Sequence, residues 1–158
     1  MNDKDIEFMQ AAISLARKAE ALDEVPVGAV IVRDGEIIAE GYNMREHGKM
    51  ATAHAEMIAI DAACRKLGGW RLCRCTLFVT LEPCPMCAGA VVNSRIERVV
   101  YGASDLRAGA CGSIFDINSY PLNHSFEIES GVCADECRKL LSDFFARKRI
   151  RKTEYTEQ

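Results

Sequence analysis

Two short segments of the sequence combine residue types that bind zinc. Cys84 and Cys87 stand three residues apart after a proline, and His54 lies thirty residues upstream. Zinc is bound by thiolate sulfur and imidazole nitrogen, and two cysteines at this spacing in the first turn of a helix place both sulfurs on one side. Three protein ligands leave the fourth position open, which is typical of a catalytic zinc. These three residues are therefore predicted to hold one Zn²⁺ per subunit.

Glu56, two residues after His54, is predicted to carry protons at this site. Two thiolates and one neutral imidazole balance the charge of Zn²⁺, and zinc lowers the pKa of a bound water toward neutrality. Residues two apart on a helix diverge by about 200°, so Glu56 does not share the ligating direction of His54. It can instead reach the water as a general acid and base. A redox pair or a structural zinc module would also contain C-x-x-C, but neither has a use for Glu56.

The other six cysteines are Cys64, Cys73, Cys75, Cys111, Cys133 and Cys137. In a reducing compartment cysteines are metal ligands or small core residues before they are disulfides. Cys133 and Cys137 lie on the apolar stripe of a predicted helix and are expected in the core. A second zinc site built from Cys73, Cys75 and these two is geometrically conceivable but disfavoured, and Cys64 and Cys111 have no evident role.

Length and composition predict one globular domain over residues 1–158. A hydrophobic fraction of 49% is too high for a disordered chain, and no apolar run approaches the ~20 residues that span a bilayer. The mixed, acidic N-terminus does not resemble a signal or transit peptide, so a cytoplasmic protein without a membrane partner is expected. The net charge of −3 argues against general nucleic-acid affinity, yet Arg and Lys crowd together near the C-terminus. The basic helix end 147–158 is either a solvated tail or a phosphate-binding edge.

The apolar periodicity predicts strands that alternate with helices. Helices are expected at 4–23, 54–67 and 84–93 and in a C-terminal segment whose stripe runs from Cys133 to Phe145; strands are expected at 27–32, 36–43, 76–81, 99–102 and 125–129, with a hairpin turn at Asp34-Gly35. Residues 103–122 are glycine-rich and are not assigned. This alternation predicts an α/β domain of three layers, with helices covering both faces of the sheet.

The pattern H-x-E…P-C-x-x-C resembles the signature of the zinc nucleobase deaminases. Further blocks surround it: Glu24 and the run VPVGAVIV, then TAHAEMIAI, TLEPCPMCAGA, SRI, YGA-x-D, GA-x-GS and L-N-H. Together they resemble the bacterial tRNA adenosine deaminases from near residue 5 to near residue 149. The resemblance implies a cytidine-deaminase-like α/β/α sandwich with a five-stranded mixed sheet, assembled as a homodimer. It implies hydrolytic deamination of adenosine to inosine at the wobble position of a tRNA anticodon.

The resemblance also implies roles for single residues. Glu56 would pass a proton from water to N1 of adenine and then to the departing ammonia. Asn43 and Ala55 would bind the target base, and Asp105 would contact its ribose. From the residues alone, Asn43 could equally be a strand-end turn residue and Asp105 a helix cap. The stretch Lys49-Met50-Ala51-Thr52 departs from the acidic-Pro pair usual in the family, so RNA contacts there are open.

The expected partner is the tRNA anticodon stem-loop, and five basic residues are candidates to bind its phosphates: Arg45, Lys49, Arg107, Arg147 and Arg149. The alternative activity is a small-molecule guanine or cytosine-type deaminase. It would share the metal site and differ in the mouth of the pocket and in the basic surface.

Overall fold

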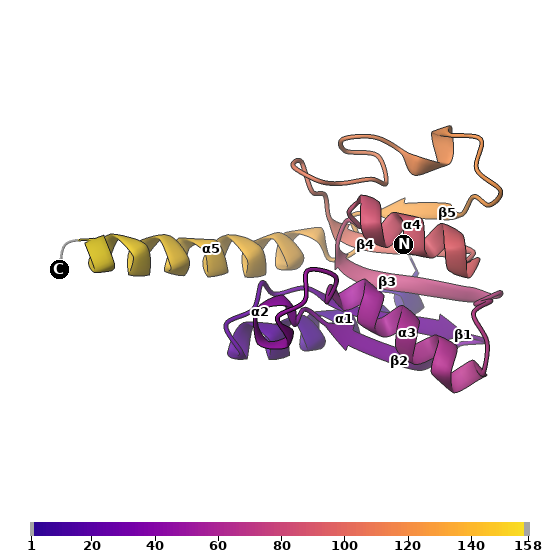
Figure 1. Ribbon diagram of the computed structural model, residues 1–158, viewed down its shortest axis with the longest axis horizontal. Coiled ribbons are helices and arrows are strands. Elements are labelled where there is room, and N and C mark those ends of the chain that lie inside the picture. The colour runs from indigo at the N-terminus through magenta and orange to yellow at the C-terminus, as the bar shows by residue number, and fades with distance from the viewer. Residues whose placement is uncertain (1, 157–158) are drawn as a thin grey trace.

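A five-stranded mixed sheet forms the centre of the fold (Figure 1). The computed structural model describes residues 2–156, and side chains as far as residue 153. The strands are β1 (Gly28–Arg33), β2 (Glu36–Tyr42), β3 (Cys75–Leu81), β4 (Arg98–Ala103) and β5 (Glu127–Ser130). Their order across the sheet is β2-β1-β3-β4-β5. Residue 1 and the last two residues of the predicted basic end, 157 and 158, lie outside the described residues.

The strand directions bring four carboxyl ends to one edge of the sheet. β1 is antiparallel to both β2 and β3, whereas β3, β4 and β5 are parallel to one another. β2, β3, β4 and β5 therefore all run in the same direction, and only β1 runs against them. The predicted hairpin between β1 and β2 is confirmed, with positive φ at both Asp34 and Gly35, as a type I′ turn requires.

Helices cover both faces of the sheet, which confirms the three predicted layers. On one face α3 (Ala55–Leu67) and α4 (Pro85–Ser94) pack against the sheet. On the other face lie α1 (Asp3–Ala21) and the first half of α5 (Ala134–Thr156). The C-terminal half of α5 extends beyond the sheet (Figure 1). Among the described residues, no helix is both long and apolar enough to cross a membrane.

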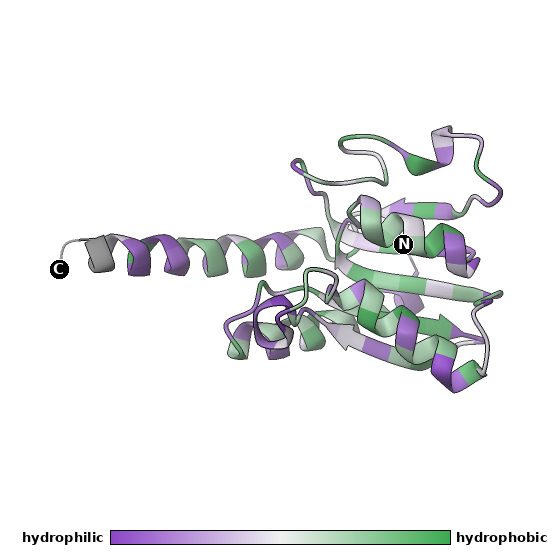
Figure 2. Cartoon of the chain, in the orientation of Figure 1, coloured by the Kyte–Doolittle hydropathy of each residue, from purple (hydrophilic) through white to green (hydrophobic). Residues whose placement is uncertain are grey.

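The central strands read as apolar runs because both of their faces are buried. In β3, Leu77 and Val79 enter the cluster under α3 and α4, while Phe78 enters the cluster under α1. Figure 2 shows β3 as hydrophobic over most of its length. Gly41 lets α3 approach β2, because a Cβ there would lie 2.3 Å from the carbonyl oxygen of Ala55. The sheet edge and the start of α3 are thus held close together.

Two segments differ from the sequence-based expectation. The segment after β2, where no helix is expected from the sequence, contains a short helix, α2 (Arg45–Gly48). The fifth strand begins at Glu127 and not at residue 125, because the side chain of Asn118 holds both the backbone N–H and the C=O of Phe126. In the unassigned stretch 103–122, residue 103 still belongs to β4, an isolated bridge joins Cys111 to Asp116, and residues 117–119 form a 3₁₀ turn, η1 (Ile117–Ser119).

Candidate metal centre and pocket

The candidate site lies where β2, β3 and β4 end. Asn43 directly follows β2, Glu82 follows β3 and Ser104 follows β4. Three residues separate the end of β3 from the start of α4, and α3 begins beside α4, so both helix N-termini lie at the same edge. This is the edge at which parallel α/β sheets place their ligands.

The three predicted zinc ligands lie together at these helix N-termini. Nδ1 of His54 is 3.7 Å from Sγ of Cys84 and 3.6 Å from Sγ of Cys87. All three ligand atoms lie within 4.8 Å of one another. Tetrahedral zinc with ordinary Zn–S and Zn–N bonds separates sulfur from nitrogen by about 3.6 Å. The donor set and its spacing therefore fit zinc as the sequence predicted.

The local structure explains why these residues converge. His54 is the N-cap of α3 and Cys84 is the N-cap of α4, with Pro85 at the first helical position. Cys87 follows in the first turn of α4, so its sulfur shares a side with that of Cys84. The positive ends of two helix dipoles point at the site and favour thiolates.

The two cysteines differ in acidity. A hydrogen bond from Cys87 lowers the pKa of Cys84 to about 4; burial opposes this effect, and a hydrogen bond from His54 adds to it. The pKa of Cys87 is raised because it donates to Cys84 and is buried. Cys84 is therefore the thiolate of the pair, and Cys87 must release its proton when it binds a metal.

Glu56 lies beside the ligands without being one of them. Its side chain is 4% exposed and shares a hydrogen bond with Cys87. Burial raises the pKa of Glu56 to about 7, while that hydrogen bond and the charge of His54 oppose the rise. A carboxyl group with a pKa near neutrality can both accept and donate a proton at the pH of a cell.

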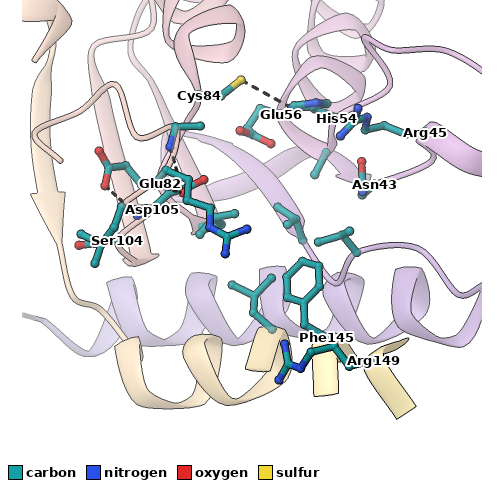
Figure 3. A pocket seen from close by; sticks show the side chains of 18 residues that line it. Asn43, Arg45, His54, Glu56, Glu82, Cys84, Ser104, Asp105, Phe145 and Arg149 are labelled. Atoms are coloured by element: carbon teal, nitrogen blue, oxygen red, sulfur yellow. Dashed lines mark hydrogen bonds between the residues drawn. The ribbon is translucent and has the colours of Figure 1, made fainter. Parts of the chain in front are cut away.

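His54, Glu56 and Cys84 form one wall of a pocket of about 580 Å³ (Figure 3). Its lining comprises Val25, Val27, Asn43, Arg45, His54, Ala55, Glu56, Leu81, Glu82, Cys84, Ser104, Asp105, Leu106, Arg107, Ala108, Leu141, Phe145 and Arg149. The predicted base-binding residues Asn43 and Ala55 are buried and both line the pocket. The volume suits a small planar ligand such as a nucleobase.

Asp105 lies at the rim of the pocket, as predicted, but its carboxylate also serves the turn. Oδ1 accepts hydrogen bonds from the backbone N–H of Arg107 at 3.0 Å and of Ala108 at 3.2 Å. The capping role and the pocket-lining position therefore hold together.

Two buried carboxylates that sequence reasoning did not single out hold the two sides of the pocket mouth. Glu24 is 1% exposed and accepts from the backbone N–H of Glu46 and of His47 and from the His47 ring. It thereby holds α2, which carries Arg45. Glu82 is 2% exposed and binds the loop that carries Asp105. Both residues stand inside the family-like blocks of the sequence, but only the fold shows what they bind.

Helix α5 closes the remaining side of the pocket with Leu141, Phe145 and Arg149, which follow one another at four-residue steps (Figure 3). The predicted core stripe is wrong at Phe145, which is 44% exposed, because α5 here turns this side toward the pocket. Phe144, which belongs to the same predicted stripe, is buried as expected, and its ring contacts that of Phe145.

The structure separates the five predicted RNA-binding residues into two groups. Arg45, Arg107 and Arg149 line the pocket. Arg147 points toward α1, where it pairs with Glu20 at 3.1 Å, and Lys49 is exposed outside the pocket lining.

Comparison with known proteins yields a consistent set of relatives. The family described as the cytidine and deoxycytidylate deaminase zinc-binding region matches residues 2–103. The tRNA-specific adenosine deaminase of Bacillus subtilis is 52% identical over 146 residues, covering 92% of this chain and 91% of that protein. The enzyme of the same name from Haemophilus influenzae is 50% identical over 150 residues, covering 94% and 87%.

Solved structures agree with these sequences. A structure from a study of A-to-I editing by tRNA:A34 deaminases at the wobble position has a TM-score of 0.81 and 42% identity, covering 85% of this chain and 99% of that one. A guanine deaminase from Nitrosomonas europaea has a TM-score of 0.75 and 29% identity, covering 89% and 84%.

Proposed function

The chain belongs to the tRNA-specific adenosine deaminases, and on that premise we propose how it acts: it removes the 6-amino group of the wobble adenosine in a tRNA anticodon, leaving inosine. The observation that carries this proposal is the set His54, Cys84 and Cys87 with Glu56 beside it, at the base of a nucleobase-sized pocket. Residues 1–158 act as one deaminase domain. Because its proposed substrate is tRNA, the enzyme acts in the cytoplasm.

The mechanism assigns one task to each group. His54, Cys84 and Cys87 hold Zn²⁺, which when bound lowers the pKa of a water molecule and so supplies the nucleophile. Glu56 takes the proton of that water and delivers it to N1 of adenine as C6 is attacked. It then takes the proton of the new C6 hydroxyl and delivers it to the amino group, which leaves as ammonia as the C6 carbonyl forms. Its raised pKa suits both directions of transfer.

The pocket walls hold the rest of the nucleotide. Asn43 supplies an amide to the base, and Ala55 packs beside it. Asp105 faces the ribose, where the oxygen that does not cap the turn can accept from a 2′-hydroxyl. Arg45, Arg107 and Arg149 ring the mouth of the pocket and bind phosphates of the anticodon stem-loop.

We also propose a homodimer, as the family resemblance implies. Large apolar side chains on the loops around the pocket are strongly exposed, among them Met50 at 56%, Leu106 at 80% and Ile114 at 57%. Contact with a second copy of the chain would cover such groups. Analytical ultracentrifugation at micromolar concentration should show a dimer, and a fully active monomer would contradict it.

The direct test is to incubate the zinc-loaded protein with total tRNA and to map inosine by sequencing. We expect inosine at the first anticodon position of tRNAs that carry adenosine there. The Glu56→Gln variant is the matched control and should leave these adenosines unchanged. Release of ammonia from free guanine without any inosine in tRNA would favour the guanine deaminase alternative.

A further inference from the structure

The loop between β4 and β5 that carries Asp105 is folded around one buried carboxylate. Oε1 of Glu82 accepts from the backbone N–H of Asp105 at 3.1 Å and from the hydroxyl of Ser113. Oε2 accepts from the backbone N–H of Cys111 at 3.0 Å and of Ser113 at 3.1 Å. Among the ion pairs of the described residues, none involves Glu82, so its charge is balanced by these four donors.

Packing contributes little to the part of this loop that forms the pocket wall. Leu106 is 80% exposed, and Ser104 and Arg107 are also exposed. The segment is tied down at Asp105, whose N–H reaches Glu82, and again beyond Gly109, where the N–H of Ala110 binds the C=O of Pro83 at 2.9 Å. The position of the wall therefore depends on the Glu82 carboxylate and not on a local core.

Gly109 also shows that the loop packs directly against the Glu82 carboxylate. A Cβ at this position would lie 2.3 Å from Oε2 and 2.4 Å from Cδ of Glu82, and 2.6 Å from the C=O of Asp105. Real Cβ atoms do not approach so closely, so a side chain at 109 would push the loop away from the carboxylate.

We propose that Glu82, with Gly109 as its cradle, is a positioning residue that sets the recognition of the target ribose by holding Asp105 at the pocket rim. This inference rests on the proposed function for its substrate, but the loop geometry that it describes does not. Glu82 acts through Asp105 and takes no part in proton transfer.

Replacing Glu82 by glutamine should release Asp105 selectively. The amide NH₂ cannot face the fixed N–H groups of Cys111 and Ser113, so it must take the place of Oε1. There the Ser113 hydroxyl can rotate to accept, whereas the N–H of Asp105 loses its acceptor. Hydrogen exchange should show faster exchange at Asp105 in Glu82→Gln, with zinc content and the amides of Cys111 and Ser113 unchanged.

The kinetic test uses the zinc-loaded full chain and two anticodon stem-loops, one with ribose and one with deoxyribose at the target nucleotide. In Glu82→Gln we expect KM for the ribose substrate to rise about tenfold with kcat within about twofold, and the preference for ribose to fall. In the Asp105→Asn background, Glu82→Gln should have no further effect, because both changes remove the same contact.

Glu24→Gln is the matched control, since Glu24 is an equally buried carboxylate that holds the opposite side of the mouth. The factor by which Glu24→Gln raises KM should multiply with the factor for Asp105→Asn, because the two residues hold different sides of the mouth. If Glu82→Gln does not fold, Gly109→Ala should give the same loss of ribose preference through the clash with Oε2. The proposal would be overturned if the Asp105 amide exchanged at an unchanged rate in Glu82→Gln. It would also be overturned if Glu82→Gln raised KM by the same factor with Asp105→Asn present as without it. Failure of the wild-type protein to deaminate either stem-loop would refute the proposed function and leave the exchange test of the loop intact.

Discussion

Glu56 combines deep burial with a hydrogen bond to a ligand cysteine, so its proton affinity is set by the site itself. Glu56→Gln keeps the size of the side chain and removes its ability to exchange protons. We expect the variant to fold and to keep one zinc per subunit while kcat falls by at least ~10²–10⁴-fold. Single-turnover deamination of a stem-loop, with zinc measured on the same sample, tests this. Substantial turnover would show that another group carries the proton.

The metal ligands give a second prediction at the residue scale. Cys84→Ala/Cys87→Ala removes both sulfurs, and His54 alone cannot bind zinc tightly. Atomic absorption should show loss of zinc, and the melting temperature should fall because the helix N-termini lose their common anchor. Cys133→Ala is the control, since that thiol packs with α1 on the face of the sheet opposite to α3 and α4. Stoichiometric zinc in the double variant would refute the assignment.

Residue types and spacing were enough to find the metal ligands, because zinc demands few donors in a fixed geometry. They were not enough to find Glu82. Its four donors come from residues 105–113, and nothing in the local sequence shows that this loop folds back over the end of β3.

At the scale of elements, the long helices and buried strands followed from their apolar periodicity, whereas short elements depend on contacts distant in sequence. Helix α2 has four residues and begins where Glu24, more than twenty residues away, accepts two of its backbone N–H groups. Arg147 and Arg149 look alike in a basic run. They diverge by about 200° on α5, so Arg147 meets Glu20 on α1 while Arg149 lines the pocket.

The different surroundings of Arg147 and Arg149 predict different effects of replacing each of them by alanine. Arg149 lines the pocket and should bind a phosphate, so Arg149→Ala should weaken stem-loop binding and reduce the slope of log Kd against log salt by about 0.7 to 0.9. Arg147→Ala should leave that slope unchanged, because its partner is Glu20. Fluorescence anisotropy over a salt series measures both, and equal slopes for the two variants would contradict the assignment.

The packing of α1 on β4 and β5 gives a prediction on pH. Arg98 binds both oxygens of Asp5 at 3.0 and 2.7 Å and lowers the pKa of that carboxyl below its ordinary 3.8, although burial acts in the opposite direction. The folded protein therefore holds this proton more weakly than the unfolded chain. The resulting stability is present above about pH 4 and is lost as the pH falls through the folded pKa.

Asp5→Asn should thus lower the free energy of unfolding by about 1–3 kcal/mol at pH 7. The difference from the wild-type protein should shrink as the pH falls below the ordinary pKa of an aspartate, because the unfolded chain then gains a proton that the folded carboxyl takes up only at lower pH. Urea denaturation followed by circular dichroism between pH 7 and pH 3 tests this. A pH-independent difference would show that the charge of Asp5 contributes nothing.

For the whole molecule, the pocket is assembled from distant parts of the chain. The metal ligands come from α3 and α4, one side of the mouth from α2, another from the loop after β4, and the last from α5. The reacting base would touch the starts of α3 and α4 and Asn43 at the end of β2, while the basic residues lie at the mouth. The preference for one substrate over another should therefore depend on contacts between the pocket mouth and the RNA outside the target base.

This arrangement predicts a strong preference for the stem-loop over its isolated nucleoside. Contacts of Arg45, Arg107 and Arg149 with phosphates would supply binding energy that holds C6 over the metal, and free adenosine offers none of them. The unpaired loop presents its base without the cost of opening a duplex. We expect kcat/KM for an anticodon stem-loop to exceed that for adenosine, guanine or cytidine by at least ~10²-fold, with the ratio falling as salt rises.

The control for this preference is Lys49→Ala, which removes an exposed charge outside the pocket and should preserve the ratio. Ammonia release from all four substrates, measured at equal concentration, tests this preference. Equal rates on the stem-loop and on a free base would mean that the mouth of the pocket plays no part in choosing the substrate.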